Sequence, residues 1–99
     1  MDAPENCIIR KGYFPDTAEG LENETYCLVS LDADLYKPTL TGLSYFYPRL
    51  VTGGYIFVHD FGTYAWGHGV KNAVREYCLE HSISYVPILD RCGSVIITK

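Results

Sequence analysis

The fold of this chain is decided by two apolar runs that each end in acidic residues, YCLVSLDAD (residues 26–34) and GGYIFVHD (residues 53–60). The segment between them has the length of one helix, and its apolar residues recur at helical spacing. Two short apolar runs joined by a helix are typical of a βαβ unit, whose parallel strands have their carboxyl ends at one edge of the sheet. Because ligands of open α/β sheets bind outside those ends, the sequence predicts a site on one shared rim.

The first of these runs is almost continuously apolar, which is typical of a parallel strand covered on both faces, so we expect it to be central in its sheet. Pro38 suits the first turn of the following helix, and Asp34 is favoured as the cap of that helix over a role as a metal ligand. Pro48 predicts a loosened last turn, after which Gly53 and Gly54 reverse the chain into the second strand.

The carboxyl-terminal third of the chain predicts one helix and a hairpin. Apolar residues recur on one face from Val70 to Cys78, with polar residues on the other. Two β-rich runs, residues 84–89 and 94–98, flank the turn residues 90–93, and Pro87 places the first run at a sheet edge. Nearer the amino terminus, we expect a short strand at residues 7–9 and a turn or short helix from residue 14 that Gly20 ends.

Composition limits the classes of protein to which the chain can belong. The 99 residues are enough for one small domain, the net charge is −4, and lysine and arginine do not cluster, so we expect no nucleic-acid partner. No apolar run approaches the roughly 20 residues that span a bilayer, so we expect no membrane partner. The amino terminus lacks the pattern of a secretion signal. These features predict a cytoplasmic protein.

The four cysteines form no C-x-x-C pair. Cys7, Cys27 and Cys78 lie in apolar runs or in a helical stripe, where a free thiol packs as a small hydrophobic side chain. We therefore expect reduced cysteines, with a zinc site as the minor alternative.

With this order of elements, the chain resembles the carboxyl-terminal part of the macrocin/mycinamicin O-methyltransferase family, which consists of class I S-adenosylmethionine-dependent methyltransferases. The matching words are KGYFPDT (11–17), LDADLY (31–36), YPRL (47–50) before Gly53-Gly54, FVHDF (57–61), and Gly69-Val70 leading into Ala73-Val74. The resemblance implies an α/β fold: residues 1–99 form a single partial domain that holds the third to seventh strands of a Rossmann-like sheet. That sheet has parallel strands, a terminal antiparallel hairpin and helices on both faces.

The resemblance also implies an activity, namely transfer of a methyl group from S-adenosylmethionine to a hydroxyl of a small molecule, a sugar or a similar glycosidic acceptor. It implies a divalent metal, Mg- or Mn-like, held by Asp32, His59 and Asp60, with Asp32 and His59 as the catalytic residues. The family usually has an acid where this chain has His59. Three roles therefore remain open for this residue: metal ligand, general base and hydrogen-bonding partner. The glycine-rich cofactor loop is absent from the chain, and we expect it upstream of Met1.

Two aromatic residues are candidates for the substrate side of the site. Tyr36 either lines the site or packs, and Trp66 either covers a sugar ring or belongs to the core. Both interpretations stay open for both residues.

Two other functions compete with the methyltransferase interpretation. The residues Asp32-Ala33-Asp34 after an apolar strand are also typical of a metal-dependent D-x-D glycosyltransferase or an aspartyl-phosphate phosphatase, although the further motifs that these need are not evident. A non-catalytic remnant is the other alternative, because residues 26–31 without a neighbouring strand would be an exposed apolar edge. We therefore expect an isolated chain that is inactive and forms homo-oligomers.

Overall fold

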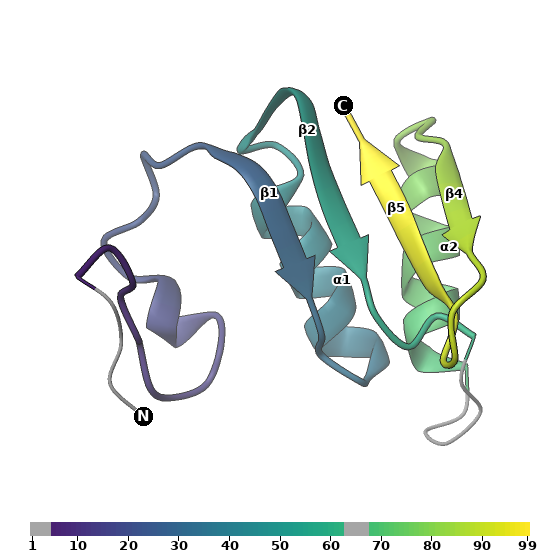
Figure 1. Cartoon of the computed structure of the whole chain (residues 1–99), viewed down its shortest axis with the longest axis horizontal. Helices are drawn as coiled ribbons and strands as arrows, with labels where there is room; N and C mark the ends of the chain where they lie inside the picture. The colour runs from purple at the N-terminus through teal and green to yellow at the C-terminus, as the bar shows by residue number, and fades with distance from the viewer. Residues whose placement is uncertain (1–4, 63–67) are drawn as a thin grey trace.

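The computed structural model of the chain describes residues 5–62 and 68–99 (Figure 1). After a short 3-10 helix, η1, strands and helices alternate until the closing hairpin. The elements are η1 (Asp16–Ala18), β1 (Tyr26–Leu31), α1 (Tyr36–Phe46), β2 (Leu50–Val58), α2 (Gly69–Glu80), β4 (Tyr85–Ile88) and β5 (Ser94–Thr98). None of the described helices is both long and apolar enough to cross a lipid bilayer.

The described strands form one sheet with the order β1-β2-β5-β4. β1 and β2 are parallel, with Val29 opposite Ile56 and Leu31 opposite Val58. β5 is antiparallel to both of its neighbours, so β4 runs in the same direction as β2. The predicted βαβ unit and the predicted hairpin are confirmed, and so is the edge position of β4, whose Pro87 cannot donate a ladder hydrogen bond.

Both described helices lie on the same face of the sheet (Figure 1). The reason is the direction of the crossovers: the chain moves from β1 to β2 and then from β2 to β4 in the same direction across the sheet. Right-handed crossovers that advance in one direction place their helices on one face. The expectation of helices on both faces is therefore wrong for residues 5–62 and 68–99.

The core lies between this face and the two helices. Its most buried strand residues are Ile56, Val58, Val95 and Ile97, and α1 and α2 add the buried residues Leu43, Val70, Val74, Tyr77 and Cys78. The helical stripe of α2 predicted from the sequence is thus confirmed by its burial. Of the two neighbouring strands that carry the acidic ends, β2 is the better enclosed.

The opposite face of the sheet is open within the described part of the chain. Leu28 of β1 is 59% exposed, and its partner Tyr55 on β2 is also exposed. β1 lies at the edge of the described sheet, so the expectation of a central strand is wrong here. Its apolar run has a buried side chain only where it faces α1, at Val29 and Leu31.

Two boundaries near these strands differ from the sequence-based expectations. Residues 7–9 form no strand, and Ile8 is 83% exposed, because no other described strand pairs with this segment. β2 begins at Leu50, so Gly53 and Gly54 lie inside the strand rather than before it. Gly54 passes so close to β1 that an added Cβ would lie 3.0 Å from the Cys27 carbonyl oxygen.

All four cysteines are free, as predicted, but their burial is not as predicted. Cys78 packs in the core, where burial raises the pKa of its thiol to about 11. Cys7 and Cys27 are exposed, as is Cys92. Only Cys78 therefore acts as a small hydrophobic packing residue.

Candidate active site at the carboxyl ends of β1 and β2

The parallel pairing of β1 and β2 brings their acidic ends to one rim. Leu31 and Val58 are the last paired residues, and the His59 N–H donates a hydrogen bond of 2.9 Å to the Leu31 carbonyl oxygen just beyond them. Asp32 and Asp60 follow directly after these two positions. The sequence placed both residues at one edge, and the geometry agrees.

Three carboxylates converge at this rim: Asp32, Asp34 and Asp60 each offer an oxygen within 4.8 Å of the others. Asp32 and Asp34 are exposed, and Asp60 is half-buried. Asp34 and Asp60 both have a φ of 63°, the left-handed conformation that aspartate tolerates better than most residues.

The three carboxylates act on one another electrostatically. Burial raises the pKa of Asp60 above the ordinary carboxyl value, and hydrogen bonds to Asp34 and Asp32, together with their charges, raise it further. The charged groups that shift this pKa are all carboxylates. Carboxylates this close to one another have the electrostatics that a bound metal ion would relieve.

Asp34 does not cap α1, which is a correction to the sequence-based expectation. The residue at the cap position is Leu35, and the helix has no side-chain cap hydrogen bond. The Leu35 N–H instead donates to the Ala33 carbonyl oxygen at 2.7 Å, which closes a tight turn around Asp34. This turn brings Asp34 into the carboxylate group.

His59 lies at the rim but outside the group of three carboxylates. Its Nε2 is 2.8 Å from the hydroxyl oxygen of Ser30 on β1. Of the three roles left open by the sequence, the geometry therefore displays that of a hydrogen-bonding partner.

A hollow of about 300 Å³ opens beside the acids. Asp32, His59 and Asp60 form part of its wall. The rest of the wall comes from the turn between β4 and β5 and the residue after it: Asp90, Arg91, Cys92 and Ser94. Sequence reasoning treated residues 90–93 only as a turn and missed their place at the site. The only signal that could have placed them there is the strand order: β5 lies next to β2, so the turn before β5 lies beside the carboxyl end of β2.

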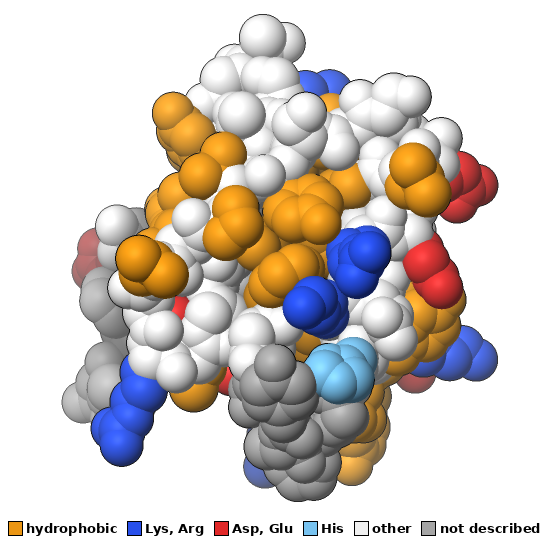
Figure 2. All heavy atoms as spheres, turned by 90° about the vertical axis from the view of Figure 1, so that its right-hand side faces the viewer, with side chains coloured by type: hydrophobic (Ala, Val, Ile, Leu, Met, Phe, Trp, Pro, Cys, Tyr) orange, Lys and Arg blue, Asp and Glu red, His pale blue; other side chains and the backbone are white. Residues whose placement is uncertain are grey.

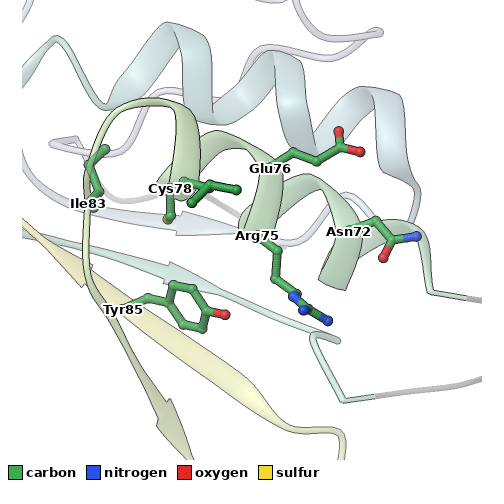
Figure 3. Close-up of a pocket in the computed structure, with 7 residues that line it drawn as sticks. Asn72, Arg75, Glu76, Cys78, Ile83 and Tyr85 are labelled. Carbon is green, nitrogen blue, oxygen red and sulfur yellow. The ribbon is translucent and has the colours of Figure 1, made fainter.

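A larger hollow of about 590 Å³ lies between α2 and β4 and shares no lining residue with the acidic rim (Figure 3). Cys78, Leu79, Ile83 and Tyr85 form part of its lining, and Arg75 is among its polar residues. The surface on the β4 side has hydrophobic side chains with lysine and arginine side chains among them (Figure 2). This hollow contains no group of acids, so the rim remains the candidate site.

Of the two aromatic candidates, Tyr36 and Trp66, the structure describes only Tyr36. The Tyr36 hydroxyl donates a hydrogen bond to the Glu76 carboxylate of α2, and this bond raises the pKa of Tyr36. Gly69, the first residue of α2, packs against the Tyr36 backbone, so Tyr36 joins the amino-terminal ends of the two helices. Trp66 lies outside the described residues.

The fold and the rim define an α/β protein of the methyltransferase type. The solved structure of the O-methyltransferase NovP superposes with a TM-score of 0.64 and 34% sequence identity, over 77% of this chain and 30% of that one. The TDP-rhamnose 3'-O-methyltransferase CalS11 shares the fold, with a TM-score of 0.60 at 22% identity over 75% of this chain and 31% of that one.

The sequence match is more specific. The family described as "Macrocin-O-methyltransferase (TylF)" matches residues 4–93, and the chain belongs to this family. Demethyldecarbamoylnovobiocin O-methyltransferase of Streptomyces niveus is 35% identical over 83% of this chain. Mycinamicin III 3''-O-methyltransferase of Micromonospora griseorubida is 34% identical, also over 83%. The chain spans 30% of the first relative and 31% of the second.

Proposed function

We propose that this chain carries the metal and acceptor side of an S-adenosylmethionine-dependent O-methyltransferase that acts on a sugar or similar hydroxyl. The convergence of Asp32, Asp34 and Asp60 at the carboxyl ends of two parallel strands is the observation that carries this proposal. A relative from Streptomyces olivaceus, 33% identical over 74% of this chain, is a 4'-O-methyltransferase of a rhamnosyl-tetracenomycin, which supports a glycosidic acceptor. Family membership favours this function over the glycosyltransferase and phosphatase interpretations.

The donor set fits a hard divalent cation. Mg²⁺ and Mn²⁺ prefer carboxylate oxygens, whereas an imidazole in the set would favour Mn²⁺, Fe, Co or Zn. Because Asp34 rather than His59 joins Asp32 and Asp60, we propose Mg²⁺ or Mn²⁺ as the metal. Such an ion, when bound, lowers the pKa of a coordinated hydroxyl and orients it for in-line attack on the sulfonium methyl group.

In this proposal, His59 takes up the proton of the acceptor hydroxyl. In the tautomer whose Nε2–H donates to the Ser30 hydroxyl, Ser30 holds the ring in place and the lone pair of Nδ1 accepts the proton. Asp32 and Asp60 hold the metal, and Asp34 completes the carboxylate set. The hollow beside the acids takes the acceptor.

The cofactor side of the site is proposed to lie outside these 99 residues. A glycine-rich turn between an early strand and a helix, of the kind that approaches the cofactor in sheets of this type, is not found in the sequence. We propose that the isolated chain is therefore inactive.

Calorimetric titration of the 99-residue chain tests whether it carries the metal side of the site without the cofactor side. We expect Mn²⁺ to bind, Mg²⁺ to compete with it, and S-adenosylmethionine to give no binding heat. Absence of Mn²⁺ binding would contradict the metal side of the proposal. A micromolar dissociation constant for S-adenosylmethionine would contradict the separation of the cofactor side.

We also propose that the isolated chain self-associates through the β1 edge and the open sheet face beside it. The outer edge of β1 has no partner strand among the described residues, and its Leu28 is exposed next to Tyr55. Unpaired edges with apolar side chains are templates for pairing with another chain.

Light scattering at tens of micromolar, on the order of transient-interface affinities, should detect a dimer or larger species. The variant Leu28→Lys should shift the population toward monomer, because it places a charge on the open face beside the edge. Leu79→Lys is the matched control, because Leu79 is 85% exposed but lies on α2. A monomeric wild-type chain, or equal effects of the two variants, would refute the proposal.

A further inference from the structure

We propose that the turn between β4 and β5, residues 90–93, positions Asp60 for metal binding through a backbone contact between Gly62 and Gly93. The inference rests on the proposed metal site and assigns a positioning role to residues that neither ligate nor react. It concerns two segments about 30 residues apart in the sequence, which meet because β5 lies next to β2.

A forked hydrogen bond joins the two segments. The Gly62 N–H donates to the Cys92 carbonyl oxygen at 2.9 Å and to the Gly93 carbonyl oxygen at 3.1 Å. Gly62 follows Asp60 by two residues, so this bond holds the chain directly after the carboxylate. The loop that carries Asp60 is thereby tied to the hairpin as well as to β1.

The contact is too close for a side chain on either glycine. A Cβ on Gly93 would lie 2.9 Å from the backbone nitrogen and Cα of Gly62, and a Cβ on Gly62 would lie 3.0 Å from the Cys92 carbonyl oxygen. The opposing atoms belong to the backbone, so they cannot rotate away as a side chain can. A methyl group at either position would push the two segments apart.

Further contacts hold both partners of this pair. On the loop side, the Phe61 ring packs on Tyr85 with centroids 5.6 Å apart, and the Lys71 ammonium lies 5.8 Å from the Phe61 centroid. On the hairpin side, Asp90 accepts a 2.6 Å hydrogen bond from the Ser94 hydroxyl. Backbone amides of the turn also bond Asp90, so the turn keeps its own shape.

Asp60 needs such support for two reasons. Its φ of 63° is unfavourable for an L residue, and its carboxylate lies against those of Asp32 and Asp34. A residue in this conformation persists when the surrounding structure holds it there. Partners that orient metal ligands typically contribute about 10- to 100-fold to metal affinity.

Alanine variants compared by Mn²⁺ titration and thermal unfolding test this role. Gly62→Ala adds the methyl group without a left-handed backbone at that position, and Gly93→Ala adds it at a φ of +69°. Gly53→Ala is the matched control, because Gly53 has a φ of +85° and no atom within 4 Å of the added Cβ. Ser94→Ala loosens the turn without adding an atom near Gly62, so it keeps the test decisive if a glycine variant does not fold.

We expect Gly62→Ala and Gly93→Ala to weaken Mn²⁺ binding by about tenfold or more. Ser94→Ala should weaken it by a smaller factor, and Gly53→Ala should lower only the unfolding temperature. Unchanged Mn²⁺ affinity in Gly62→Ala, Gly93→Ala and Ser94→Ala, with normal affinity in wild type, would overturn the positioning role alone. A wild-type chain without Mn²⁺ affinity would overturn the metal site and this role with it.

Discussion

Replacing Asp60 with Asn is expected to weaken Mn²⁺ binding by at least about tenfold, equivalent to about 1.4 kcal/mol, and to raise the unfolding temperature of the metal-free chain. The amide keeps the shape of the side chain and removes its charge. Metal affinity falls because one of three converging carboxylates is lost. Stability rises because the remaining acids no longer repel a third charge that is also half-buried.

The pH dependence of this stabilisation has a defined sign. The pKa of Asp60 is raised in the folded chain, so the folded state binds a proton more readily than the unfolded state. The contribution of Asp60 to stability is complete below its ordinary pKa of 3.8 and is lost as the pH rises through the folded-state value. Thermal scans should therefore show a benefit of Asp60→Asn that is small in acid and grows toward neutral pH.

Asp16→Asn provides the control for Mn²⁺ affinity and for the unfolding temperature, because Asp16 lies in the short 3-10 helix η1 and outside the carboxylate group. It should leave Mn²⁺ affinity unchanged and should not reproduce the stabilisation. Asp32→Asn should weaken Mn²⁺ binding in the same direction as Asp60→Asn. Wild-type affinity in both site variants would exclude the rim as the metal site.

The second large effect is expected on stability: Leu43→Ala should destabilise the chain by about 2–5 kcal/mol. Leu43 of α1 is fully buried in the core between the helices and the sheet. Alanine favours the helix slightly, so the loss comes from removed packing and the cavity that remains. In a domain of this size each kcal/mol lowers the unfolding temperature by about 4–8 °C, so the midpoint should fall by at least about 8 °C.

Leu79→Ala is the same chemical change on α2, where the side chain is exposed. Its unfolding midpoint by circular dichroism should stay close to that of wild type, because little packing is lost. Equal midpoints for Leu43→Ala and Leu79→Ala would contradict the burial of Leu43 in the core.

Much of the fold could be predicted because its signals are local. The stripe from Val70 to Cys78 reports which face of α2 is buried, and the turn residues 90–93 mark the hairpin. The apolar residues at 7–9 gave a false signal, because a strand also needs a partner and none of the described strands pairs with this segment. The position of β1 was misjudged for a related reason, since an apolar run does not reveal how many neighbours the strand has.

The candidate site, like the fold, was predictable from the sequence only in part. That Asp32 and Asp60 share one edge follows from the sequence, because parallel strands joined by a helix must end on the same side of the sheet. The folded chain was needed to show that Asp34 joins them, that His59 hydrogen-bonds Ser30, and that the turn after β4 forms the opposite wall. These features depend on left-handed backbone turns and on contacts between segments far apart in the chain, and residue periodicity records neither.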